Sequence, residues 1–204
     1  MSQLKLTADG GGGTVALKGP ASTTGNAAIE LTAPGTGNGT ILTTNSSVGK
    51  ILQVVAANKT DTFSASASNG TYHDITGLSV SITMTNASNK VLIQFQSSYS
   101  TGSDLGQRGS FRLLRGSTVI NVGDTAGSRT RGIFPSMEVR QTQMSTPVAG
   151  CFLDANPSAG TYTYKLQVSA EAGAGNVVVN STTGGDSVTH YRGASNLIVM
   201  EVAA

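Results

Sequence analysis

Charged side chains are scarce in this sequence, and residue types that mark several protein classes are rare or missing. Only 12% of the 204 residues are charged, the formal net charge is +2, there is no tryptophan, and Cys151 is the single cysteine. The lysines and arginines are scattered rather than gathered in a stripe, which argues against nucleic-acid binding. One cysteine excludes an intrachain disulfide, so stability is expected to come from packing and assembly.

Long apolar runs and ligand clusters are also missing. No stretch approaches the roughly 18 apolar residues of a membrane-spanning helix, and the chain does not begin with a basic-then-apolar leader. We therefore expect a soluble protein made in a cytoplasm, with no membrane partner. Histidine and cysteine do not occur at metal-ligand spacing, so neither a metal nor a cofactor is predicted.

The N-terminal quarter is organised as a repeat of short apolar pairs separated by glycine, threonine and asparagine. The pairs are Leu4 with Leu6, Val15 with Leu17, Ile29 with Leu31, and Ile41 with Leu42. Each unit is typical of one short strand and a turn. Ordering such a strand costs about 1–2 kcal/mol of backbone entropy per residue, which one or two buried side chains do not offset. The repeat must share a core with the rest of the chain, with sister copies or with another protein.

The texture changes near Lys50, which we take as the boundary between residues 1–50, a β-tail for trimerisation and attachment, and residues 51–204, a β-sandwich domain. No segment of the second part has a helical period. Strands are predicted at 51–57, 61–65, 78–85, 91–99, 110–115, 118–122, 137–143, 146–154, 161–170, 177–180 and 197–202. This number and spacing of strands predicts an all-β, jelly-roll-like sandwich.

Two kinds of strand can be distinguished by their patterns. Residues 78–84 and 162–170 alternate apolar and polar side chains, which predicts one dry and one wet face. Residues 91–93 and 197–200 are apolar at every position, which indicates central strands or strands that also meet a neighbouring subunit. The hairpin of highest local propensity joins 111–115 to 118–120 through Gly116-Ser117, because glycine supplies the positive φ of a tight turn.

Catalytic chemistry finds little support. His73 and His190 could join an aspartate and a serine in a triad, but no G-x-S-x-G elbow or oxyanion signature marks a nucleophile, and both histidines are expected in polar loops. Asp124, Asp154 and Asp186 lack the spacing of a calcium loop. The glycine run at 10–13 precedes a strand pattern rather than a helix, so it is not a phosphate-binding loop. We predict no catalytic residues.

Two polar, glycine-flanked segments are the candidate interaction loops. The first, 123–132, carries Asp124, Arg129 and Arg131, and the second, 184–193, carries His190 and Arg192. Arginine is frequent for a chain so poor in charge, and its planar fork suits specific pairing at a subunit or partner interface. The alternative is that most arginines are solvated or pair locally with Asp104, Asp124 or Glu138.

Several stretches together resemble structural proteins of tailed phages, especially aquatic ones. Leu4-Lys5-Leu6 and residues 15–26 and 35–45 are similar to the N-terminal head of such proteins. Residues 111–117, 123–131 and 199–204 are similar to the jelly-roll-type domain behind that head. The resemblance spans most of the chain, and its motifs are structural. It implies a virion component with a β-rich tail that attaches or trimerises and a domain that projects outward.

On this basis the first hypothesis is a non-enzymatic, homotrimeric capsid decoration (cement) protein that binds the major capsid protein or another virion protein and is assembled in the host cytoplasm. The second is a short tail-fibre or receptor-binding tip, whose loops would recognise a host surface glycan or protein. A third, a polysaccharide depolymerase, lacks a pair of carboxylates and aromatic platforms. The eight apolar residues of the repeat are the predicted attachment or trimer interface.

Overall fold

The computed structural model describes residues 3–7, 14–18, 51–102, 107–155, 157–185 and 187–204. The chain divides into two units, Met1–Ser46 and Ser47–Ala204. In the first, β1 (Gln3–Thr7) pairs antiparallel with β2 (Thr14–Lys18), so that Leu4 lies opposite Leu17 and Leu6 opposite Val15. The first two apolar pairs of the repeat therefore lie on strands.

The other half of the predicted repeat lies outside the described residues. It consists of Ile29 and Leu31 in the third unit, and of Ile41 and Leu42 in the fourth. The assignment of Leu31 and its three companions to an attachment or trimer interface therefore stays a prediction.

The regular secondary structure of the second unit consists of eleven strands and one short 3-10 turn among the described residues. They are β3 (Ile51–Lys59), β4 (Phe63–Ser66), β5 (His73–Met84), β6 (Lys90–Thr101), β7 (Gln107–Arg115), β8 (Thr118–Ile120), β9 (Met137–Val139), β10 (Thr146–Asp154), β11 (Gly160–Ala170), β12 (Asn176–Val179) and β13 (Ser195–Val202). One short 3-10 turn, Ala172–Ala174, precedes β12. Within the described ranges, no helix is long and apolar enough to cross a membrane.

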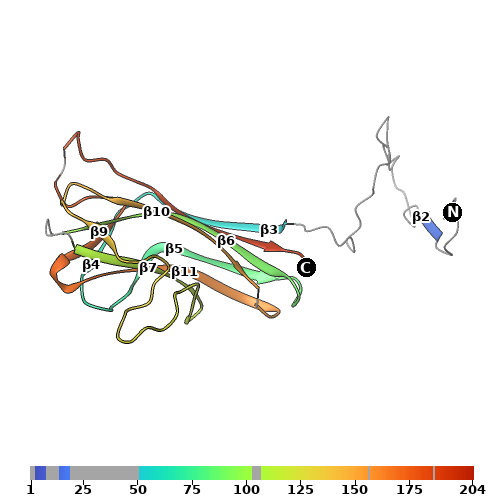
Figure 1. Cartoon of the computed structure of the whole chain (residues 1–204). Helices are drawn as coiled ribbons and strands as arrows, with labels where there is room; N and C mark the ends of the chain where they lie inside the picture. The colour runs from blue at the N-terminus through green and yellow to red at the C-terminus, as the bar shows by residue number, and fades with distance from the viewer. Residues whose placement is uncertain (1–2, 8–13, 19–50, 103–106, 156, 186) are drawn as a thin grey trace. The chain divides into compact units, whose positions relative to one another are not determined.

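The strands form two antiparallel sheets, drawn as two layers in Figure 1. In the first sheet β3 pairs with β13, β13 with β6, and β6 also with β10. In the second, β5 pairs with β11, β11 with β7, and β7 with β8 and β9. Most successive long strands thus lie in opposite sheets, as in a jelly roll. The predicted all-β sandwich class is confirmed.

The core lies between the sheets and follows the predicted alternation. Leu78, Val80, Ile82 and Met84 of β5 are at most 6% exposed. β11 is the neighbour of β5 in the same sheet, and its alternating apolar residues point to the same side. Of these, Tyr164, Leu166 and Val168 are fully buried. The predicted hairpin is present as β7–β8, with Gly116 at φ +59° in its turn. The all-apolar segments 91–93 and 197–200 lie on β6 and β13, each of which has a strand on both sides.

The two largest differences between predicted and observed strand boundaries are at the start of β5 and the end of β9. β5 begins at His73 rather than Leu78, which places His73 on a strand and not in a polar loop. Its pairing with β11 skips between Lys165 and Gln167, where a bulge contains Gly77 at φ +90°. The bulge breaks the alternation and conceals the first part of the strand. β9 ends at Val139, because the chain turns at residues 141–144 before β10.

Candidate functional site

The first predicted loop is longer than its glycine flanks suggested and is anchored to the second sheet. It runs over residues 121–136, between β8 and β9, and hangs below that sheet in Figure 1. The backbone N–H of Ile133 donates to Phe111 O at 2.8 Å, and Ser110 Oγ donates to Phe134 O at 2.8 Å. Tyr72 Oη donates to Arg131 O at 3.0 Å. The loop is therefore held at three points along its second half.

The charged residues of this loop have different environments. Arg131 is turned back on its own loop, where its Nε donates to Gly123 O at 2.6 Å. Asp124 is exposed. Arg129 lines a cleft of about 660 Å³ together with Arg108, Tyr72, Phe134 and Glu171. Two guanidinium groups beside aromatic rings are suited to anionic or hydroxyl-rich ligands.

The second predicted loop lies elsewhere on the domain. Residues 181–194 separate β12 from β13, and His190 and Arg192 line a hollow of about 280 Å³ with Ser181, Thr183 and Gly185. His190 Nδ1 lies 2.7 Å from Gly185 O, and since a carbonyl only accepts, this nitrogen carries the proton. At the tip, Val188 is 97% and Tyr191 84% exposed. The structure thus places the five predicted loop residues on two separate surfaces rather than in one site.

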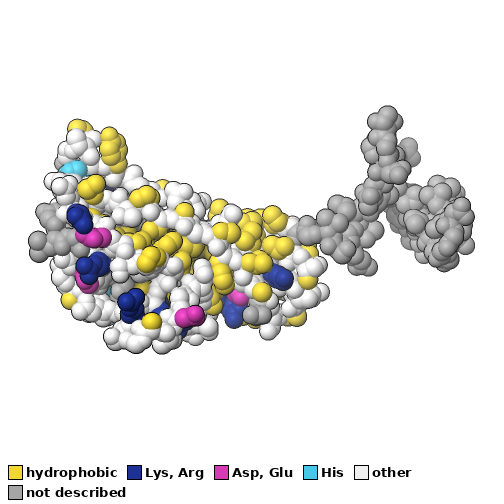
Figure 2. Space-filling view, viewed as in Figure 1, with side chains coloured by type: hydrophobic (Ala, Val, Ile, Leu, Met, Phe, Trp, Pro, Cys, Tyr) yellow, Lys and Arg dark blue, Asp and Glu magenta, His cyan; other side chains and the backbone are white. Residues whose placement is uncertain are grey.

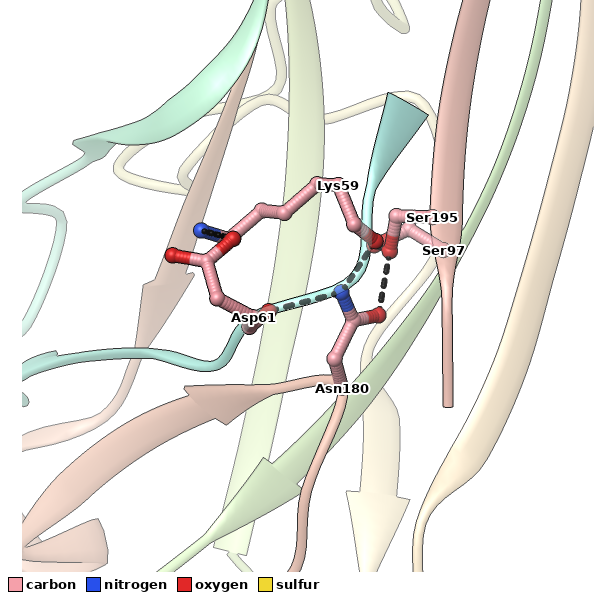
Figure 3. A network of polar contacts seen from close by, with 5 residues as sticks. All are labelled: Lys59, Asp61, Ser97, Asn180 and Ser195. Carbon is pink, nitrogen blue, oxygen red and sulfur yellow. Dashed lines mark hydrogen bonds and ion pairs between the residues drawn. The ribbon is translucent and has the colours of Figure 1, made fainter. Parts of the chain in front are cut away.

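A buried polar network closes the base of this second loop (Figure 3). Asn180, which is 1% exposed and has φ +62°, donates from Nδ2 to Lys59 O at 2.9 Å and to Asp61 O at 3.1 Å. Its Oδ1 accepts from Ser195 Oγ at 2.6 Å. Gly193 N also donates to Asn180 O at 3.2 Å. Both ends of the loop are therefore tied to the same asparagine.

The network of Figure 3 extends to one ion pair. Lys59 is 3% exposed, and its ammonium lies 2.9 Å from an oxygen of Asp61. The hydrogen bond from Lys59 lowers the pKa of Asp61, although that carboxylate is at the surface. A buried lysine needs such a partner, because an isolated charge is costly inside a protein.

The two ends of the domain carry different segments of the chain. Ile51, where the N-terminal segment joins, pairs with Val202, whereas Lys59 pairs with Ser195 at the base of the second loop. Eight residue steps along β3 correspond to roughly 26 Å at about 3.3 Å per residue. Figure 1 shows the start of β3 and the C-terminus at one end of the sandwich, and β4 and β9 at the other. The attachment point of the repeat and the projecting loop thus lie at opposite ends.

Two ionic groups inside the sandwich were not predicted. Asp154 of β10 accepts hydrogen bonds from Arg115 of β7, at 2.9 and 2.8 Å, and from Tyr164 Oη of β11 at 2.8 Å. This group joins the two sheets. Burial and the neighbouring carboxylate raise the pKa of Tyr164, so its hydroxyl stays protonated and donates. The sequence analysis did not foresee this pair, because Arg115 and Asp154 lie 39 residues apart in the chain.

The second buried group surrounds Glu201, which is fully buried in β13. It accepts from Thr85 N and Oγ1 at 2.8 Å, from Asn89 Nδ2 at 2.6 Å and from Gln53 Nε2 at 2.6 Å. Burial alone would raise the pKa of Glu201, but these hydrogen bonds outweigh it and lower the pKa to about 2. The signal in the sequence was a lone glutamate inside the apolar stretch 197–202.

The outer faces of the two sheets differ in chemistry. On the second sheet, Ser81 and Thr163 share a hydrogen bond at 2.8 Å, as do Thr83 and Thr161, and Lys165 pairs with Asp74 at 2.7 Å. On the first sheet, one row of outward side chains crosses four of the six strands, β3, β13, β6 and β10, and is apolar throughout. We call this row, Val54, Met200, Leu92 and Leu153, the apolar belt.

Catalytic and metal-binding residues were not expected, and the described part of the chain holds no group of three His, Cys, Asp or Glu side chains placed to bind a metal ion. His73 Nε2 lies 2.9 Å from Ser66 O, and His190 contacts Gly185 O. Neither of these contacts joins a histidine to a serine hydroxyl or a carboxylate.

No protein-family model matches the chain, and no curated protein matches it in sequence. Among solved structures, the chain is similar to one described as the structure of infectious bursal disease virus Gx strain. The TM-score is 0.38, the sequence identity is 15%, and the match covers 74% of this chain and 40% of that chain.

Proposed function

We propose that this protein is a non-enzymatic virion structural protein, and that it acts as a homotrimeric decoration protein on the head of a tailed phage. The observation that carries the proposal is the polarity of the domain. The apolar repeat joins at Ile51, at one end of β3, and the loop with exposed Val188 and Tyr191 leaves the other end. Such a molecule is suited to be held at one end and to make contacts at the other.

The mode of action is multivalent binding. A protein that binds only the assembled shell stabilises it by RT ln(1 + [L]/Kd), and three linked attachment segments multiply the effect through their effective concentration. The paired strands β1 and β2, with Leu4 opposite Leu17, are the described part of this segment. The partner is the major capsid protein or another protein of the particle, and no covalent chemistry is required.

The test removes residues 1–50 and measures binding to particles that have been stripped of the protein. We expect the full chain to rebind and to restore resistance to heat, and the truncated chain to remain folded by circular dichroism but unbound. If particles without the protein tolerate heat and pressure as well as complete ones, the decoration role is wrong.

A second function is favoured by the loop at residues 181–194. Its base is fixed by Asn180, while Val188 and Tyr191 at its tip are almost fully exposed, as in loops that recognise a partner from a rigid scaffold. In this case the protein would be a short tail-fibre or receptor-binding tip that contacts a host glycan or surface protein. Copy number separates the two: quantified bands from purified particles should give hundreds of copies for a decoration protein and a few dozen at most for a fibre.

A further inference from the structure

We propose that the cleft between the loop at 121–136 and the outer face of the second sheet is a binding site for a carboxylate-bearing saccharide. The proposal goes beyond the virion role, because it concerns a ligand that the isolated protein would bind. It also differs from recognition through the loop at 181–194, because the cleft is a separate surface and its side chains indicate one class of ligand.

The cleft is formed where the loop crosses the second sheet. Gly132 of the loop lies so close to β7 that a Cβ at residue 132 would overlap Ser110 Oγ. Arg129 and Thr130 line the cleft from the loop, and Tyr72 lines it from the segment before β5. Its volume of about 660 Å³ lies within the range of about 300–1,000 Å³ that is typical of small-molecule sites. The cleft therefore has room for a ligand larger than a simple anion.

The cleft lies near one end of the domain. Arg108 and Gly109, which line it, pair with Glu138 and Met137 of β9. Figure 1 shows β9 at the end opposite the start of β3, and Figure 2 shows several Lys and Arg side chains in that part of the molecule, with a few acidic ones among them. The cleft is thus far from the point where the N-terminal segment joins.

Two guanidinium groups are available to a ligand in the cleft. The side chains of Arg108 and Arg129 are exposed and form neither an ion pair nor a hydrogen bond with any residue that the structure describes. Glu138, opposite Arg108, pairs instead with Arg140 at 2.9 Å. Among the described lining residues, Glu171 is the only acidic one, so positive charge is in excess. Arginine binds a carboxylate through two parallel hydrogen bonds, and the cleft therefore favours an anionic ligand.

A buried hydroxyl also faces the cleft. Ser169 of β11 is 5% exposed and lies between Val168 and Ala170, whose side chains belong to the core. Because side chains alternate along a strand, Ser169 points to the outer face of the sheet, where it lines the cleft. Its Oγ has no hydrogen-bond partner among the described residues. Buried polar groups nearly always have a partner, so this hydroxyl is placed to bind a ligand.

The other polar groups indicate a saccharide rather than a simple anion. Asn69 Oδ1 accepts from Ala172 N at 2.8 Å, which leaves the side-chain N–H groups of Asn69 for a ligand. Glu171 Oε1 accepts from Arg108 N at 2.7 Å, and its second oxygen can accept from a hydroxyl. A sulfate ion only accepts hydrogen bonds and would be repelled by Glu171, whereas the hydroxyl groups of a sugar both donate and accept.

Two aromatic rings supply an apolar surface on which a sugar ring can pack. Tyr72 and Phe134 line the cleft, and both are partly buried. The Phe134 ring meets the ring of Phe95 edge to face, with the centres 6.2 Å apart, and the Tyr72 hydroxyl is tied to Arg131 O. Rings held in this way lose little conformational freedom when a ligand binds. They form an aromatic surface that the composition did not predict.

The test measures the binding of saccharides to the full chain by titration calorimetry. The probes are tetragalacturonate, sialyllactose and the carboxyl-reduced form of each, which is neutral. We expect at least one acidic probe to bind, and its reduced form to bind about tenfold more weakly, because the guanidinium groups then lose their charged acceptor. The two acidic probes distinguish a uronic acid from a sialic acid as the source of the carboxylate.

Variants locate the binding site. Arg129→Gln should weaken binding of the acidic probe about tenfold, and Ser169→Ala about threefold. Lys90→Gln is the control, since it removes a positive charge from an exposed side chain of β6 outside the cleft, and it should bind as the unsubstituted protein does. Arg192→Gln, in the separate hollow of the second loop, should also bind unchanged. Circular dichroism confirms that each variant is folded.

Four results would overturn the proposal. Neither acidic saccharide binds, or the neutral forms bind as tightly as the acidic ones. Arg192→Gln weakens binding and Arg129→Gln does not, which would place the ligand on the second loop. Tetraglutamate binds as tightly as the saccharides, which would assign the cleft to an acidic peptide. The virion role is tested separately by rebinding to particles, so the failure of one proposal can be told from that of the other.

Discussion

The two outer faces of the sandwich are both formed by antiparallel sheets, yet their outward side chains differ: those of the second sheet are polar and hydrogen-bonded, whereas a row on the first sheet is apolar. On the second sheet, hydroxyl pairs and the Lys165–Asp74 ion pair satisfy the outward side chains, and the loop at 121–136 is anchored alongside. On the first sheet, the apolar belt runs from Val54 on one edge strand, 58% exposed, to Leu153 on another, 45% exposed, while Met200 between them is 9% exposed. An antiparallel sheet needs only one dry face to fold, so the apolar side chains on the outer face of the first sheet are not required by the sandwich core.

Two buried polar groups hold the two sheets together. Asp154 with Arg115 and Tyr164 joins them inside the sandwich, and the group around Glu201 joins β3 and β13 to the end of β5.

Substituting Asp154 by alanine should have the largest effect on stability. The change leaves the guanidinium of Arg115 and the hydroxyl of Tyr164 without their shared acceptor in a buried place. Breaking a buried ion pair by removing one partner costs about 3–5 kcal/mol. Urea unfolding measures the loss. Glu138→Ala is the control, since its pair with Arg140 is at the surface and is worth less than about 1 kcal/mol.

Glu201→Gln should remove a stabilising group whose contribution depends on pH. The folded pKa is about 2, below the ordinary value of 4.5, so the carboxylate stabilises the fold fully above pH 4.5 and loses this effect as pH falls toward 2. At neutral pH the variant should be less stable by about 1–3 kcal/mol, and the difference should shrink in acid. Unfolding midpoints at several pH values measure this. A difference that stays constant with pH would contradict the assignment.

Asn180→Gly should loosen the base of the loop at 181–194. Glycine keeps the positive φ but loses the bonds to Lys59 O, Asp61 O and Ser195 Oγ. We expect a loss of about 1–3 kcal/mol and faster hydrogen exchange of the amides near the loop base. Asn121→Gly is the matched control, because Asn121 also has a positive φ, +53°, outside this network. Equal effects of both substitutions would show that the hydrogen bonds are unimportant.

Arg112→Met should have the smallest effect, confined to the polar face. The guanidinium carbon of Arg112 lies 4.1 Å from the centre of the Tyr72 ring, and its Nε donates to Gln167. Methionine keeps an apolar stem but no charge, so the expected loss is about 1 kcal/mol. Thermal unfolding gives the difference, with Arg140→Met as an exposed reference. A larger loss than that of Asn180→Gly would reverse the order proposed for the two regions.

The class of fold could be predicted from the sequence because apolar and polar residues alternate along the strands, which marks the inward positions. Leu78 to Met84 and Tyr162 to Ala170 are the clearest cases, and the Gly116 turn fixes the β7–β8 hairpin locally. Where the alternation is interrupted, the prediction loses accuracy. The bulge at Gly77 conceals the first residues of β5, and the turn after Val139 shortens β9.

The buried ion pair and the apolar belt depend on long-range pairing, which local patterns do not contain. Asp154 and Arg115 are far apart in the chain, and only the packing of β10 and β7 in opposite sheets brings them together. The apolar belt likewise follows from the register of four strands. Patterns in 91–93 and 197–200 did indicate strands apolar on both faces, and contact with a neighbouring subunit stays a prediction.

The structure describes only part of the N-terminal repeat, so it tests less of the prediction there than elsewhere. Its first two units form the β1–β2 pair, as the short apolar pairs predict. A role in attachment stays a prediction for all eight apolar residues, which are Leu4, Leu6, Val15, Leu17, Ile29, Leu31, Ile41 and Leu42. Short strands take their core from whatever they pack against, so the sequence of the repeat does not identify its partner.

The tie made by Asn180 has a consequence for how this protein can change. The side chain of Asn180 binds Lys59 O and Ser195 Oγ at the start of β13, and Gly193 N donates to Asn180 O at 3.2 Å. The loop at 181–194 therefore leaves and re-enters the domain at one point. Insertions between such neighbouring ends cost little loop entropy. The loop could therefore be exchanged or lengthened, in the course of evolution or by an engineer who displays a foreign peptide, while the sandwich beneath it keeps its fold.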